Sequence, residues 1–260
     1  MSPTIIDPID SKQIEHDARE RGSKLARVVT YYDELGSTND QAAKEAASGA
    51  AHGLVIIADR QLSGRGRSSR VWHSPAGQNL YLSLLLRPQH TLEQLAPITL
   101  VIGLAVSDVA ADLLGVHHVG VKWPNDVLVG SRKLAGILVE SASIDSRVEH
   151  VIVGIGLNVH QVNFDPVIAP IATSLALEGA EDLSRTKIAS RLLSAVESRL
   201  DQFDARGMTQ LVDELRARDL TLGRPVKVEG RHGIARGISD DGRLRVSFED
   251  GTTVLVYAGE

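Results

Sequence analysis

The stretch that decides the fold is KWPNDVLVGSRKLAGILVE, residues 122–140. Lys122 closes an apolar run, and Asn125-Asp126 after Trp-Pro is typical of a turn between two strands. Asp126 opens the next run, and Lys133 opens a third run that continues to residue 144. A lysine and a carboxylate at adjacent strand ends could bind a phosphate and a metal or an amine. Turn chemistry and a solvated lysine at a strand start would explain the same residues without any ligand.

Further elements are predicted on both sides of this stretch. Runs of β-branched residues bounded by turn residues indicate strands, and Ser-Thr-Asn-Asp before an Ala-rich run indicates a helix start. The prolines within residues 160–180 predict a loop. The expected strands are 27–35, 53–60, 79–88, 119–123, 133–144 and 147–159, and the expected helices are 37–48, 92–114 and 184–203.

Changes in composition along the chain predict three regions. Residues 1–26 are polar and predict an N-terminal arm or helix. Residues 27–219 carry the elements named above and predict one large domain. Residues 220–260 contain short alternating runs, glycine turns and a DDG hairpin signal, which predict a small all-β barrel of SH3 size.

Composition excludes several classes of protein. With 43% hydrophobic residues the chain can bury a core, and its net charge of −5 and 3% aromatic residues argue against a nucleic-acid binder. The absence of cysteine excludes disulfides and thiolate metal sites. Pro97 and two aspartates interrupt the longest apolar run, which predicts a buried helix rather than a membrane span. Residues 1–25 lack the apolar region of a signal peptide, so we expect a cytoplasmic protein.

Three other motifs combine glycine with polar residues. GRGR, residues 64–67, could clamp an anion, although a solvated basic loop or a nucleic-acid patch would look the same. The two glycines of GIGLNV, residues 154–159, leave one face of a strand without side chains, where a ligand could lie, but tight strand packing also explains them. The motif lacks the third glycine of a dinucleotide-binding fingerprint. GSTND, residues 36–40, predicts a helix N-cap whose hydroxyls could also face a pocket.

In their order along the chain, these motifs resemble the biotin–protein ligase family. GSTN, RQLSGRGR, KWPND, KLAGIL, GIGLN and ATSL follow one another from about residue 30, and an LG..V start precedes the terminal β barrel. KWPND with KLAGIL is the most specific part. The resemblance implies an α+β fold of the class II synthetase-like, biotin–lipoate ligase type. This fold is a mixed β-sheet flanked by helices, with a small SH3-like β-barrel at the C-terminus.

The resemblance also implies an activity. The family joins biotin to ATP as biotinyl-5′-AMP and then transfers biotin to a lysine of a biotin carboxyl carrier domain, as in acyl-CoA or pyruvate carboxylases. ATP and biotin are the implied substrates and Mg²⁺ the implied cofactor. Because the biotin carboxylate and the α-phosphate are both anions, the reaction needs fixed positive charge. The implied catalytic residues are Lys133, Arg67 and Asp126, the last as a group that positions the acceptor lysine or a Mg²⁺ ion.

Residues at the family's motif positions are implied to contact the two substrates. For biotin they are Ser37, Thr38, Asn39, Gln61, Arg65, Gly66, Arg67, Lys133, Gly136, Gly154 and Gly156. For ATP they are Arg65, Arg67, Arg70, Trp72, Lys122, Asn125, Asn158 and Phe164. We expect the loops at 63–72 and 160–172 to be mobile without ligand, and the first to close over an anhydride that water would destroy.

The chain departs from the family pattern in two places. Ser68-Ser69 stand where the family commonly has a glycine, so this loop could be stiffer or retain the adenylate less well. Only about 30 residues precede the catalytic region, so we expect the short form without a helix-turn-helix and without DNA binding, as a monomer or a homodimer. Two alternatives remain: a lipoate–protein ligase or octanoyl transferase of the same fold, and a biotin-sensing regulator without catalysis.

Overall fold

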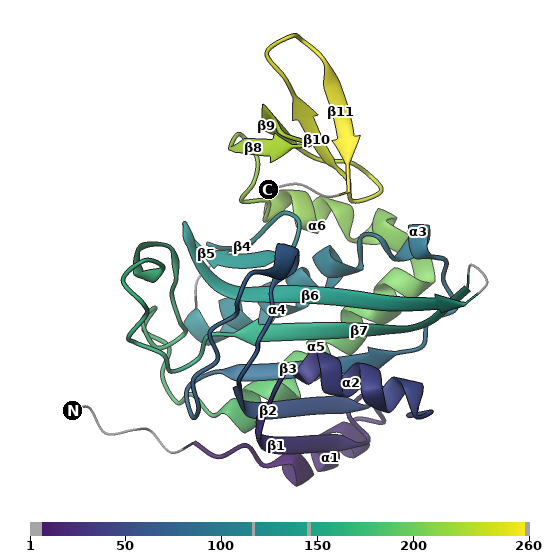
Figure 1. The fold of residues 1–260 in the computed structure, drawn as a ribbon, viewed down its shortest axis with the longest axis vertical. Helices are drawn as coiled ribbons and strands as arrows, with labels where there is room; N and C mark the ends of the chain where they lie inside the picture. The colour runs from purple at the N-terminus through teal and green to yellow at the C-terminus, as the bar shows by residue number, and fades with distance from the viewer. Residues whose placement is uncertain (1–6, 116–117, 145–146, 258–260) are drawn as a thin grey trace.

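A computed structural model describes residues 7–115, 118–144 and 147–257 of the chain. Its strands form one seven-stranded and one four-stranded sheet (Figure 1). The strands are β1 (Val29–Leu35), β2 (Val55–Gln61), β3 (Leu80–Leu86), β4 (Val119–Lys122), β5 (Asp126–Val129), β6 (Arg132–Ile144), β7 (Arg147–Leu157), β8 (Pro225–Val228), β9 (Arg231–Ile238), β10 (Leu244–Ser247) and β11 (Thr253–Val256). The α-helices are α1 (Ser11–Glu20), α2 (Thr38–Ala47), α3 (Leu92–Leu95), α4 (Ile98–Leu114), α5 (Arg185–Arg206) and α6 (Val212–Ala217).

The large sheet is mixed and carries the opening stretch of sequence. Its strand order is β1-β2-β3-β7-β6-β5-β4. β1 pairs with β2 in parallel, and every other neighbouring pair is antiparallel. KWPND forms the turn between β4 and β5, and KLAGIL lies in β6, as the sequence predicted. The mixed sheet flanked by helices confirms the expected fold class.

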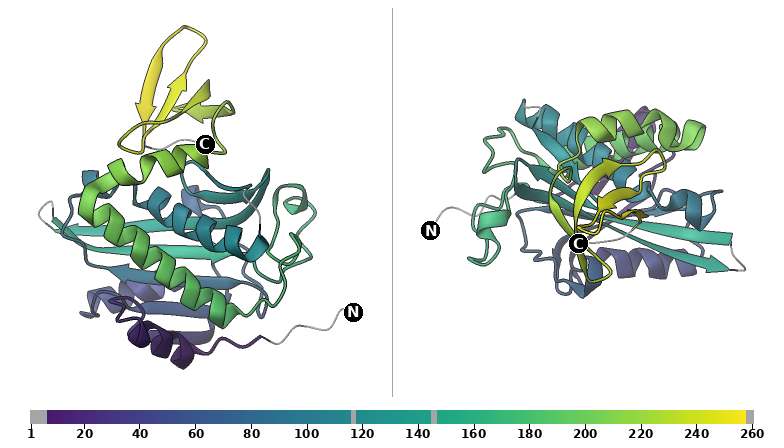
Figure 2. Two further views of the ribbon diagram at one scale, coloured as in Figure 1. Left: turned by 180° about the vertical axis from the view of Figure 1, so that it is seen from behind. Right: turned by 90° about the horizontal axis from the view of Figure 1, so that it is seen from above.

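Helices cover the two faces of this sheet unequally. α4 and α5 pack behind it, and α2 lies on the front face (Figures 1 and 2). All residues of β3 are buried, because this strand lies between α2 and the helices behind. The chain that follows β2 crosses the front of the sheet beside α2 (Figure 1). α2 packs against Ile152 of β7, whereas Trp72 of this loop lies over Gly136 of β6 and Gly156 of β7.

The apolar segment expected as one helix is divided into α3 and α4. Pro97 has no amide hydrogen to continue α3, and α4 begins at the next residue. The segment Leu92–Leu114 is long and apolar enough to cross a membrane, but 67% of its most apolar window is buried inside the protein. The segment is therefore buried in the core, as the sequence predicted, although it forms two helices rather than one. The short helix α6 was not predicted.

The C-terminal strands form a separate antiparallel sheet in the order β11-β10-β9-β8. The small all-β unit expected here is present as this sheet, in which β8 and β11 do not pair within the described part of the chain. The indole nitrogen of Trp123 donates a hydrogen bond to the carbonyl of Gly242 at 3.3 Å. This contact joins the C-terminal sheet to the KWPND turn.

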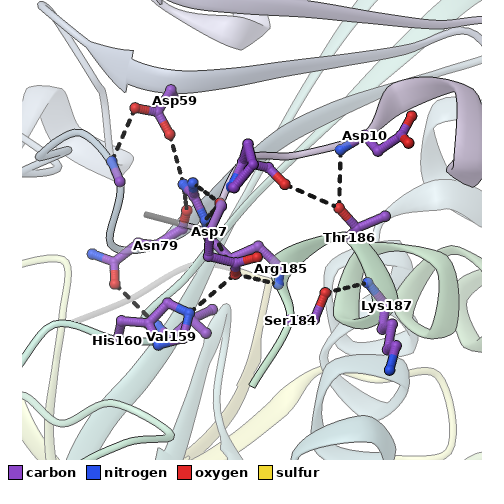
Figure 3. Close-up of polar contacts among 12 residues, drawn as sticks. Asp7, Asp10, Asp59, Asn79, Val159, His160, Ser184, Arg185, Thr186 and Lys187 are labelled. Atoms are coloured by element: carbon purple, nitrogen blue, oxygen red, sulfur yellow. Dashed lines mark hydrogen bonds and ion pairs between the residues drawn. The ribbon is translucent and has the colours of Figure 1, made fainter. Parts of the chain in front are cut away.

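The N-terminal residues are anchored through a buried arginine. Arg185, at the start of α5, is 1% exposed and pairs with Asp59 at 2.7 Å (Figure 3). It also donates to the carbonyl oxygens of Asp7 and Asn79. The Asn79 side chain in turn accepts a hydrogen bond from the amide of Val159 at 3.0 Å. The network fixes the N-terminal segment, α5 and the beginning of the loop after β7 to one another.

Candidate active site

Every site residue predicted from the sequence lines one pocket. Its volume is about 510 Å³, and its lining includes the first residues of α2 and the chain that follows β2. The pocket extends from Gln61 at the end of β2, over β7 and β6, to Asp126 on β5 and Lys122 on β4. Since β2 and β5 are four strand spacings apart, the pocket reaches across roughly 19 Å of sheet.

Glycines form the floor of this pocket. Gly136 of β6 and Gly156 of β7 are directly opposite each other, and the Trp72 ring lies over both. A Cβ atom at Gly156 would be 2.5 Å from the Trp72 ring, and one at Gly154 would overlap the Asn39 side chain. Larger residues therefore cannot occupy these positions without moving Trp72 or Asn39, so close packing of these two side chains accounts for the glycines, and their contact with a ligand stays a prediction.

One end of the pocket offers neutral hydrogen-bonding groups. The Gln61 side chain accepts from the Thr38 amide at 2.9 Å and donates to the Ser74 hydroxyl at 3.0 Å. The N-cap residue Ser37 makes no capping hydrogen bond with its side chain, although it precedes α2. Hydroxyl and carboxamide groups in this arrangement suit a small polar ring with both donors and acceptors.

The other end of the pocket is charged. The Lys133 ammonium lies 2.7 Å from an oxygen of Asp126 and 5.1 Å from the centroid of the Trp72 ring. Asp126 is paired in register with Lys122. Lys122 and Lys133 therefore flank one carboxylate at neighbouring strand ends, which gives this end of the pocket a surplus of positive charge for an anionic ligand.

The GRGR loop is held over the pocket by its first arginine. Arg65 forms ion pairs with Asp40 at 2.5 Å and with Glu140 at 3.0 Å. The hydrogen bond to Asp40 raises the pKa of the Arg65 guanidinium above its usual value. Arg67 donates to the Asn125 side chain at 3.3 Å. The expected mobility of this loop stays a prediction.

The two serines that depart from the family pattern have an unusual backbone. Ser68 has a φ of 54° and Ser69 a φ of 59°, which is the left-handed region that glycine adopts most readily. Both serines lie in the short 3₁₀ turn Arg67–Ser69. The family's glycine is therefore replaced by serine in a turn whose backbone conformation glycine adopts more readily than serine does.

The loop after β7 forms one wall of the pocket. Asn158 donates from its side chain to the carbonyl of Thr173 at 2.8 Å. The Thr173 amide donates to the carbonyl of Lys133 at 2.9 Å. Phe164 lies on the pocket wall, as do Ile168 and Ile171 of the same loop. Thr173 of the ATSL segment therefore holds the Asn158 side chain and the Lys133 backbone in place.

Sequence reasoning missed several polar residues of this site. Ser83 on β3 is fully buried and lies 2.8 Å from the Thr38 hydroxyl, and Glu140 accepts from Asn39 at 2.6 Å. Gln161 lines the pocket and accepts from Asn79 at 2.6 Å. A serine inside the apolar run LYLSLLL and a glutamate ending KLAGILVE were the available signals.

The residues present do not form a site for a resident metal ion. The described ranges contain no group of three or more His, Asp or Glu side chains that could hold one. Asp126 is already paired with Lys133. Its proposed contact with Mg²⁺ stays a prediction.

Comparison with known proteins identifies the family. The sequence profile of the biotin/lipoate A/B protein ligase family matches residues 34–158, and that of the biotin protein ligase C-terminal domain matches residues 221–260. The biotin–[acetyl-CoA-carboxylase] ligase of Mycobacterium tuberculosis is 40% identical over 262 residues, covering 97% of this chain and 95% of that protein. The bifunctional ligase/repressor BirA of Bacillus subtilis is 35% identical, over 90% of this chain and 74% of its own length.

A solved structure gives the same result. The biotin protein ligase of Aquifex aeolicus in complex with biotin and ATP matches with a TM-score of 0.77 at 30% identity. The match covers 90% of this chain and 97% of that structure. From the motifs, the pocket that unites them and these likenesses, we conclude that the chain belongs to the biotin protein ligase family.

Proposed function

We propose that this protein activates biotin with ATP and transfers it to a lysine of a biotin carboxyl carrier domain. The observation that carries the proposal is the single pocket that joins a neutral hydrogen-bonding end to a cationic end over a glycine floor. A ureido ring suits the end formed by Ser37, Thr38 and Gln61. A carboxylate and a triphosphate suit the end formed by Lys122, Lys133 and Arg67.

Two displacements complete the proposed reaction. A carboxylate oxygen of biotin attacks the α-phosphorus of ATP, the bond to the bridging oxygen breaks, and pyrophosphate leaves. The amine of the acceptor lysine then attacks the carbonyl of biotinyl-5′-AMP, AMP leaves, and the amine loses a proton. Lys133 stabilises the negative charge that gathers between carboxylate and phosphate in the first step. Arg67 holds the phosphate, and Asp126 positions the incoming lysine.

Several finer statements belong to the proposal. The substrates are biotin and ATP with its Mg²⁺, and the acceptor is the carrier domain of an acyl-CoA or pyruvate carboxylase. The net charge of −5 supports an enzyme that does not bind DNA. The enzyme is a monomer or a homodimer in this proposal. The absence of cysteine and the burial of the apolar segment Leu92–Leu114 support a cytoplasmic location.

Biotin-dependent ATP–pyrophosphate exchange tests the proposal, with lipoate as the parallel substrate. We expect exchange with biotin alone, followed by biotinylation of an apo carrier domain when it is added. Exchange with lipoate only would make the chain a lipoate ligase. Binding of biotin without exchange would favour the regulator.

A further inference from the structure

A chain of hydrogen bonds runs behind the neutral end of the pocket. Glu140 on β6 accepts from the Asn39 side-chain nitrogen at 2.6 Å, and the Asn39 oxygen lies 2.6 Å from the Ser83 hydroxyl. That hydroxyl lies 2.8 Å from the hydroxyl of Thr38. Asn39, Ser83 and Thr38 are each at most 4% exposed, so these contacts are shielded from bulk water.

The proton positions in this chain follow from its outer end. A carboxylate only accepts hydrogen bonds, so the Asn39 nitrogen must face Glu140 and the Asn39 oxygen must face Ser83. An amide oxygen also only accepts, so Ser83 commits its single proton to Asn39. The remaining contact, between Ser83 and Thr38, then requires Thr38 to be the donor.

The opposite side of Thr38 leads to the same result. The Ser74 hydroxyl donates to the carbonyl of Trp72 at 3.0 Å and therefore accepts from the Gln61 nitrogen. This fixes the Gln61 oxygen toward Thr38, 3.1 Å from its hydroxyl. The Thr38 proton thus has two acceptors within the protein, Ser83 and Gln61, and its lone pair is left for the pocket.

We propose that Glu140 and Ser83 are positioning residues that make the Thr38 hydroxyl an acceptor for a ureido N–H of biotin. The inference rests on the proposed function, because it assumes that biotin places its ring at this end of the pocket. It explains why a strand of apolar residues carries a serine, and why Gly154 must leave room for Asn39.

The same chain reaches the GRGR loop. Arg65 donates to both oxygens of Glu140, at 3.0 and 3.2 Å, and pairs with Asp40 on its other side. Glu140 therefore touches both a loop arginine and the amide that orients Ser83. Among the described residues the Asp40 side chain bonds this arginine, and it forms no hydrogen bond with the side chains of Asn39 or Ser83. The two carboxylates therefore have different roles: Asp40 only anchors the loop, whereas Glu140 also orients Asn39.

A set of matched variants of the full chain tests the proposal by calorimetric titration with biotin. Ser83→Thr and Ser83→Val add the same volume, but only the first keeps a hydroxyl. We expect Ser83→Val to bind biotin about tenfold more weakly than Ser83→Thr, the effect of one hydrogen bond. We expect Glu140→Gln to weaken binding by roughly fivefold or more, because a glutamine side chain no longer dictates which way Asn39 faces. Asp40→Asn should stay within about twofold.

The KM for ATP in the exchange reaction separates positioning from general damage to the fold. It should be the same in Ser83→Val as in Ser83→Thr, because the Ser83 hydroxyl bonds Asn39 and Thr38 and, within the described ranges, does not contact the GRGR loop. Equal biotin affinity of the Thr and Val variants, or a Glu140→Gln variant indistinguishable from wild type, overturns the proposal. A parallel loss of ATP affinity in Ser83→Val overturns it as well. A wild-type protein that binds no biotin would instead refute the proposed function.

Discussion

Replacement of Lys133 by methionine removes the cation that we place between the two anionic substrates. The Lys133 ammonium lies 2.7 Å from Asp126, and the two side chains are 33% and 20% exposed. Two unit charges about 4 Å apart interact by about 4 kcal/mol at an effective dielectric constant near 20. Loss of one preorganised electrostatic group costs roughly 2.7–4 kcal/mol in measured cases, or about 10²–10³ in kcat. We therefore expect kcat for biotin-dependent exchange to fall by about 10²–10³.

The variant also leaves Asp126 without its cation, and this predicts a partial rescue. An unpaired carboxylate repels the incoming phosphate, so the double variant Lys133→Met with Asp126→Asn should be faster than Lys133→Met alone. Stability should change by no more than about 1 kcal/mol, because the pair is partly exposed and screened. Arg132→Met is the matched control: its guanidinium pairs with Glu178 at 2.8 Å, outside the pocket lining.

Pyrophosphate exchange at saturating biotin and ATP, with urea unfolding in parallel, measures both quantities. A folded Lys133→Met variant with kcat within fivefold of wild type would refute the electrostatic role. An Arg132→Met variant with the same loss would show that any cation on β6 matters, and not the one facing the substrates.

Three further changes have defined outcomes. Gly156→Ala should displace Trp72, whose ring lies 2.5 Å from the added carbon, and raise the KM for biotin about tenfold or more; unchanged tryptophan fluorescence and KM would show that the ring does not rest on this floor. Arg185→Met should lower the free energy of unfolding by about 1–3 kcal/mol, because two backbone carbonyls lose their buried donor and the partly buried Asp59 loses its cation; no measurable loss in urea would contradict this. Hydrogen bonding to an arginine lowers the pKa of Asp241 to about 2, so its stabilising effect is complete above pH 3.8 and fades as the pH falls toward 2. Asp241→Asn should therefore lower the free energy of unfolding by under about 1 kcal/mol near pH 5, and by less at lower pH. A difference from wild type that grows as the pH falls would contradict this.

The sequence was most informative where chemistry restricts the choice of residue. Lys133, Arg67 and the three floor glycines were found from KLAGIL, GRGR and GIGLN, and all of them line the pocket. Pro97 was recognised as an interruption of the apolar run, but the division of the predicted helix at this proline was not expected. The C-terminal strands were predicted from their alternation, but alternation does not determine whether the first and last strands pair.

Ser83 and Glu140 show what a linear reading leaves out. Each is an ordinary residue in its own strand, and only the pairing of β3 with β7 and of β7 with β6 brings both to Asn39. Local patterns predict the elements and the residues with distinctive chemistry, because both depend on near neighbours along the chain. The direction of each hydrogen bond, and with it the acceptor that faces the ligand, depends on contacts between strands and helices distant in sequence, which only the packed tertiary structure determines.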